Sequence, residues 1–173
     1  IRSYHWLEAL RSRHEVHMVT LRDETSNAEH ESQLRRRCAS LSVIELSGWR
    51  SRLRTLGSLV RGEALSLGHF RESGAQDAIR RLSRDVTFDL IFEYSSPMAM
   101  FTADSSQTPR IMDMVDVDSA KFESYARLGR GGRRIIYRLE AGRLGRFEEA
   151  IAATHDAVVL CTEPEADILR GRC

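Results

Sequence analysis

Short apolar runs alternate with longer segments of helical periodicity along the whole chain, and this alternation constrains the fold more than any other feature. Five runs rich in apolar and β-branched residues are predicted to be strands: residues 15–21, 41–46, 88–94, 110–117 and 156–161. Strands that alternate with helices at this spacing indicate a parallel sheet with helices on both faces. We therefore predict an α/β fold of the Rossmann-like type.

The segments between the predicted strands have the spacing of amphipathic helices. Helices are predicted over residues 1–13, 27–38, 49–60, 73–85 and 133–154, with shorter ones after Pro97, from Ser119 and after Thr162. Thr162 and Glu165 have the spacing of a capping box at the start of the last helix. One side of residues 133–154 is expected to face the core, and it carries Ile136, Leu139, Phe147 and Ile151.

Composition excludes several classes of protein. The chain has 173 residues, of which 42% are hydrophobic and 29% charged, as in a globular domain and unlike a disordered chain. No apolar run reaches the roughly 18–20 residues that a membrane-spanning helix needs. The net charge of +1 argues against nucleic acid as a partner. Three cysteines without metal-ligand spacing favour a reduced, cytoplasmic compartment.

Polar residues follow the predicted strands at the edge where parallel sheets bind ligands. Asp113, Asp116 and Asp118 lie in the fourth strand and its exit. Such carboxylates can act as a base, hold sugar hydroxyls or bind a metal ion. The alternative is a solvated strand end in which Asp118 caps the next helix. After the third strand, Ser95 and Ser96 can contact a polar ligand, together with Glu93, or can simply begin a turn.

Two arginine-rich segments each have two interpretations. Residues 129–134 (GRGGRR) look like a phosphate cradle at a helix start, but no strand precedes them, which favours a helix–helix connection. The helix from Trp49 to Arg61 combines an apolar stripe with several arginines. That combination suits an anionic membrane surface, although the stripe can equally pack on the sheet.

Several stretches, taken together and in order, resemble the N-terminal half of GT-B glycosyltransferases of family 4, and most of all the sugar transferases of bacterial exopolysaccharide and exosortase-associated clusters. The matching segments are residues 1–5 (IRSYH), 61–67 (RGEALSL), 88–99, 112–119 (MDMVDVDS), 147–152 (FEEAIA) and 156–168. The resemblance covers nearly the whole chain.

The resemblance implies an enzyme that moves a sugar from a nucleotide-sugar donor to a lipid-linked or saccharide acceptor, at the cytoplasmic face of the cell membrane. It implies no cofactor besides the nucleotide-sugar co-substrate, and no metal. Asp116 is carried over as the catalytic carboxylate, although Val115-Asp116 stands where many relatives have His-Asp. The remaining carried-over residues are predicted to bind the acceptor: Arg2, His5, Ser95, Ser96, Asp113 and Asp118.

The resemblance also implies that residues 1–173 form a single incomplete acceptor-side domain, which lacks the first strand of its sheet and the donor-binding half. Because that strand lies in the middle of the sheet in relatives, we expect the isolated chain to be unstable or to aggregate, which denaturant melts would test. Two other functions stay open: a Mg²⁺-dependent nucleotide-binding domain that uses Asp116 and Asp118, and a non-catalytic α/β domain.

Overall fold

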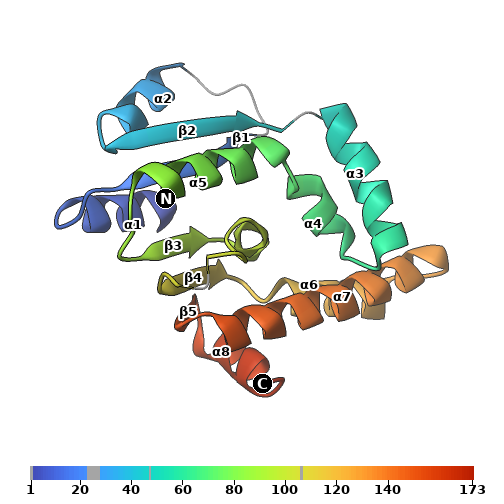
Figure 1. The fold of residues 1–173 in the computed structure, drawn as a ribbon. Coiled ribbons are helices and arrows are strands. Elements are labelled where there is room, and N and C mark those ends of the chain that lie inside the picture. The colour runs from blue at the N-terminus through green and yellow to red at the C-terminus, as the bar shows by residue number, and fades with distance from the viewer. Residues whose placement is uncertain (1, 23–27, 47, 106) are drawn as a thin grey trace. The chain divides into compact units, whose positions relative to one another are not determined.

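A computed structural model describes residues 2–22, 28–46, 48–105 and 107–173 of the chain (Figure 1). Parallel strands flanked by helices confirm the predicted α/β class. The chain divides into two compact units, one formed by Ile1–Arg50 with Glu72–Val86 and the other by Ser51–Arg71 with Thr87–Cys173. We describe each unit by itself.

The first unit contains a two-stranded parallel sheet of β1 (His17–Arg22) and β2 (Ser40–Glu45), in which His17 pairs with Ser40. Its helices are α1 (Arg2–Arg11), α2 (Ala28–Arg35) and α5 (Ser73–Asp85). Helix α5 packs on both strands, and Gly74 lets its backbone approach Ile44 of β2 closely. The buried apolar side chains described in this unit are small in number: Leu7, Leu41, Ala75 and Ala78.

The second unit contains a three-stranded parallel sheet in the order β3–β4–β5, with strands Ile91–Tyr94, Arg110–Val115 and Ala157–Leu160. The central strand β4 is buried on both faces, which explains its four apolar residues, while its two charged residues, Arg110 and Asp113, are buried as well. The other elements are α3 (Gly48–Arg61, mostly in this unit), α4 (Leu65–Phe70), the 3₁₀ helix η1 (Ser96–Phe101), α6 (Asp118–Leu128), α7 (Gly132–Thr154) and α8 (Glu163–Arg170).

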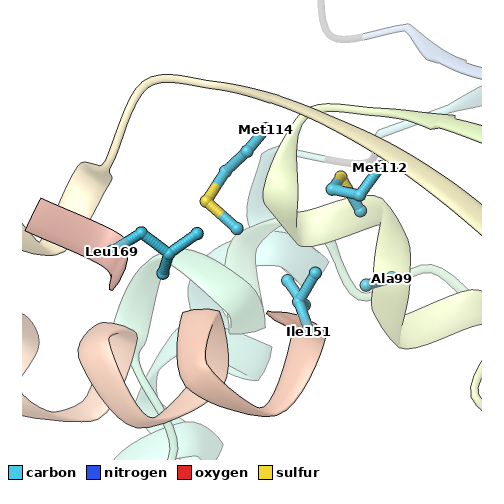
Figure 2. Packing of buried hydrophobic residues seen from close by; sticks show 5 residues of the cluster. All are labelled: Ala99, Met112, Met114, Ile151 and Leu169. Atoms are coloured by element: carbon cyan, nitrogen blue, oxygen red, sulfur yellow. The ribbon is translucent and has the colours of Figure 1, made fainter. Parts of the chain in front are cut away.

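The core of the second unit lies against one face of β4. Met112 and Met114 are two residues apart in the strand, so their side chains lie on the same face. They pack with Ala99 of η1, Ile151 of α7 and Leu169 of α8, as Figure 2 shows. Residues from four different elements thus pack together on this face of the sheet and hold β4 in position.

Helix α7 is linked to α4 and α6 by two buried glutamates, which lie eight residues apart on its core side. Glu140 accepts hydrogen bonds from the backbone N–H groups of Leu65 and Ser66, at 2.7 and 2.8 Å, and so caps the start of α4. Glu148 accepts one from the N–H of Ser119, at 2.9 Å, at the start of α6. N–H groups at the starts of two helices, which have no partner within their own helix, are thus satisfied by side chains distant in sequence.

One predicted buried face was wrong, on α7, and on α3 one of two open interpretations does not hold for the described residues. On α7, Phe147 and Ile151 pack in the core, but Ile136 and Leu139 are exposed, because the core side carries Glu140, Ala141 and Leu144 instead. On α3, Leu53, Leu56 and Val60 are exposed, so this part of the stripe is not packed on a sheet. The side chains of Trp49, Arg50 and Arg52, which belong to the same prediction, lie outside the described part of the helix.

The capping box at α8 was half right. Thr162 is the N-cap residue, as predicted. Its hydroxyl, however, donates to the Glu165 carboxylate at 3.0 Å and does not bond a backbone N–H group of the helix. The other oxygen of Glu165 accepts from the N–H of Val117 at 3.4 Å, so this side chain links α8 to the exit of β4.

Candidate functional site

Two residues with positive φ stand at the ends of neighbouring strands. Ser95, with φ of 77°, directly follows β3, and Val115, with φ of 69°, is the last residue of β4. The left-handed region is costly for any side chain, and most of all for a β-branched one such as valine. Strain of this kind persists where the surroundings enforce it, and it is concentrated at functional sites.

Hydrogen bonds hold both strained residues in place. The N–H of Ser95 donates to the carbonyl of Asp113 at 2.8 Å, so Ser95 stays attached to β4 although its φ is positive. The N–H of Val115 donates to the Asp113 carboxylate at 3.1 Å, and the N–H of Asp116 donates to the carbonyl of Met114 at 2.9 Å. The pairing of β4 with β5 shifts register between Asp113 and Val115. The end of β4 is therefore a sharp, well-supported turn.

Ser96 presents an unusual hydroxyl at this edge. The residue is fully buried at the start of η1, directly before Pro97. Its Oγ has no hydrogen-bond partner in the part of the chain that the structure describes. A buried hydroxyl without a partner costs about 1–3 kcal/mol, so a water molecule or a ligand oxygen would be stabilised there.

The three predicted aspartates differ in their surroundings. Asp113 is fully buried and supports the turn, whereas Asp116 is exposed directly after it. Asp118 is half-buried as the first residue of α6, whose N-cap is Val117, so its carboxylate is not the cap. Burial raises the pKa of Asp118, Lys121 opposes this, and the nearby charge of Asp116 adds to it. Asp116 and Asp118 thus share one electrostatic environment.

The structure brings five of the seven predicted site residues to the carboxyl ends of β3 and β4: Ser95, Ser96, Asp113, Asp116 and Asp118. The other two lie in the first unit, where Arg2 begins α1 and His5 is exposed on the same helix, with its ring 5.8 Å from that of Tyr4. The roles assigned to all seven stay predictions.

One of the two interpretations of residues 93–96 had Glu93 contact a ligand at the rim of the sheet, but Glu93 is buried. Its carboxylate lies 2.9 Å from Nε2 of His155, and it also accepts a hydrogen bond from the Thr102 hydroxyl. The Nδ1 atom of His155 lies 2.9 Å from the carbonyl of Ile151, so both ring nitrogens of this histidine have a polar neighbour. Glu93 therefore belongs to an internal network that ties β3 to the end of α7.

A cluster of polar side chains at the start of α6 was not predicted from the sequence. Glu148 is fully buried and also accepts a hydrogen bond from the Ser119 hydroxyl. Arg172 donates to Ser119 Oγ and lies 3.4 Å from Glu148 and 3.0 Å from Glu123. The available signal was a glutamate on the buried face of a predicted helix, because such a charge needs a partner.

Burial raises the pKa of Glu148, while the two bonds from Ser119 and the charge of Arg172 offset part of that rise.

No group of three or more histidine, cysteine or acidic side chains suitable for a metal ion occurs among the described residues. Within the same residues, no helix combines the length and the apolar character that crossing a bilayer requires.

The comparisons with known proteins identify no relative. No protein-family model matches the chain, and neither a curated protein nor a solved structure is similar to it.

Proposed function

We propose that this chain is the acceptor-side part of a glycosyltransferase of GT-B type that moves a sugar from a nucleotide-sugar to a lipid-linked or saccharide acceptor. The observation that carries the proposal is the edge of the sheet at β3 and β4. Two strained residues, Ser95 and Val115, are each followed by a polar group: the buried Ser96 hydroxyl, which has no partner among the described residues, and the exposed Asp116 carboxylate. That edge combines the polar groups by which a site orients hydroxyl-rich ligands.

Asp116 is the residue best placed for the chemistry. Its carboxylate is exposed directly after the turn, so it can accept a hydrogen bond from the attacking hydroxyl of the acceptor. The acceptor oxygen then bonds to the anomeric carbon of the donor sugar, the nucleoside diphosphate leaves with the bonding electrons, and the hydroxyl proton passes to the carboxylate. Asp118 beside it, whose pKa is raised, is expected to hold a second hydroxyl of the acceptor.

The test is sugar transfer by the full-length protein that carries this chain. Asp116→Asn keeps the shape but removes the basic oxygen, so the rate is expected to fall about a hundredfold or more. Asp77→Asn is a matched control, since Asp77 is exposed on α5 in the other unit. Unchanged transfer by the Asp116→Asn variant would contradict the proposal. Transfer lost on chelation of divalent cations would favour the Mg²⁺-dependent alternative.

We also propose that the enzyme works at the cytoplasmic face of the cell membrane. Helix α3 supports this, because its sequence has four arginines and no acidic residue. Leu53, Leu56 and Val60 are exposed on the helix, Val60 to 92%. An amphipathic helix of this composition can lie in the interface of an anionic bilayer.

A further inference from the structure

The connection between α6 and α7 forms an arginine-rich tip that the proposed sugar transfer does not use. Helices α6 and α7 lie side by side (Figure 1) and are joined by Gly129–Gly131. We define the hairpin tip as residues 124–139. It contains no acidic residue and five arginines: Arg127, Arg130, Arg133, Arg134 and Arg138.

Most of the charge of the hairpin tip is not paired with any acidic residue in the described part of the chain. All five arginines are exposed. Arg127 lies 3.9 Å from Glu123, and the other four have no ion pair with any residue that the structure describes. Some arginines elsewhere in the chain are paired: Arg37 bonds Glu8, and Arg172 bonds Glu123. The tip therefore carries an uncompensated positive charge, which attracts a polyanionic partner.

Aliphatic side chains surround these arginines. Leu128 is 84% exposed and Ile135 61% exposed, and Ile136 and Leu139 are also exposed. In α7 the core side is defined by Glu140, Ala141 and Leu144. With 3.6 residues per turn, Ile135 and Leu139 lie on the opposite side of the helix, one turn apart. Their exposure thus follows from the packing of α7, and they form an apolar stripe beside the charges.

Three aromatic side chains pack against one another between α6 and α7 at the hairpin tip. The rings of Phe122, Tyr125 and Tyr137 contact one another, with centroids 5.7–6.1 Å apart. Tyr125 and Tyr137, together with Arg130 and Arg133, line an open hollow of about 440 Å³. Tyrosine is a residue of the membrane interface, since its ring is apolar and its hydroxyl is polar.

We propose that the hairpin tip docks on an anionic phospholipid bilayer. Leu128, Ile135 and Leu139 enter the boundary between headgroups and acyl chains, and the exposed arginines bind lipid phosphates, which guanidinium groups hold in bidentate fashion. Acidic lipid supplies the opposite charge, and the bilayer supplies the apolar phase that the aliphatic residues require. A nucleic acid offers no such phase. This contact is separate from α3 and does not depend on sugar transfer.

The test is sedimentation of the full-length protein that carries this chain, without vesicles and with vesicles of pure phosphatidylcholine or of phosphatidylcholine with phosphatidylglycerol. Binding is expected only to the vesicles with phosphatidylglycerol, and it should weaken as salt rises. The triple variant Arg130→Gln, Arg133→Gln, Arg134→Gln should bind at least about tenfold more weakly, because each surface arginine contributes to attraction by acidic lipid. The double variant Leu128→Ser, Ile135→Ser should also lose binding, although its charge is unchanged.

Two controls keep the outcomes distinct. Arg81→Gln with Arg84→Gln removes two exposed arginines of α5 and should bind as the wild type does. Leu56→Gln with Val60→Gln disrupts the exposed stripe of α3 alone. If only that variant loses binding, or if no vesicle is bound, the role of the hairpin tip is overturned. Far-ultraviolet circular dichroism of each variant verifies that it is folded.

Discussion

At the scale of single residues, Glu148 has a carboxylate in surroundings that disfavour its charge. Burial raises its pKa in the folded protein, so the folded state holds a proton at pH values where the unfolded chain, with a glutamate pKa of about 4.3, has lost it. The free energy of unfolding contributed by this group therefore falls as pH rises through the window between the unfolded and the raised folded pKa.

Glu148→Gln should remove this dependence. Denaturant melts between pH 4 and 8 measure the free energy of unfolding of both proteins. The value for the variant minus that for the wild type is expected to grow with pH, by at most about 1.4 kcal/mol per pH unit, which is the limit for one proton. Asp118 is present in both proteins, and its charge is one of the causes that raise the pKa of Glu148. A difference independent of pH would show that the group ionises alike in both states.

At the same scale, the sequence predicted which residues lie at the carboxyl ends of β3 and β4, but it did not predict their strained backbone conformations. Ser95 directly follows a predicted strand and Asp116 lies near the end of another, which was enough to place both at the carboxyl ends. Nothing in a run such as MDMVDV predicts a positive φ at Val115, because that conformation comes from the register shift between β4 and β5 and from the Asp113 carboxylate. Such features depend on partners distant in the chain.

At the scale of elements, all five strands were predicted from apolar runs, with ends that differ by a few residues. The third strand begins at Ile91 and not at residue 88, since its pairing with β4 begins there, opposite Arg110. Helix α4 was missed because a helix of six residues is too short to show helical periodicity in the sequence. The residue that caps its start, Glu140, lies 74–75 residues further along the chain, so no local capping signal marks it. Exposed Ile136 and Leu139 have the same spacing as a buried face, so periodicity alone cannot separate them.

The packing of α4 against α3 gives a prediction for these two elements. A Cβ atom at Gly68 would lie 2.2 Å from Ser58 Oγ and 2.9 Å from both the Arg54 carbonyl and Thr55 Cα. Because two of these atoms belong to the backbone, a rotamer change cannot relieve the overlap. Gly68→Ala should lower the free energy of unfolding by about 1–3 kcal/mol, although alanine favours helices.

The matched control for Gly68→Ala is Gly142→Ala, an exposed helical position where a Cβ atom meets nothing within 4 Å. There the change should be neutral or stabilising by up to about 1 kcal/mol, from helix propensity alone. Urea melts of the two variants measure both effects. Equal stabilities would mean that α3 and α4 do not approach as closely as the structure has them.

At the scale of the whole molecule, the two units differ in how much apolar surface they bury. In the first unit, β1 is half-buried along its entire length, and only Leu7, Leu41, Ala75 and Ala78 are buried apolar residues among those described. In the second unit, β4 is buried on both faces and packs with residues of η1, α7 and α8. A sheet of two strands with so small a core contributes little to its own stability.

Native-state hydrogen exchange should therefore separate the units. The amides that join β1 to β2 are expected to have protection factors at least about tenfold lower than those that join β3, β4 and β5, equivalent to about 1.4 kcal/mol in opening free energy. The comparison should use amides hydrogen-bonded across strands, such as Leu46 to Arg22 and Ile91 to Pro109, with rates corrected for local sequence. If both sheets exchange with the same free energy and the same denaturant dependence, the chain opens as a single cooperative unit, and the smaller core of the first unit does not set its stability.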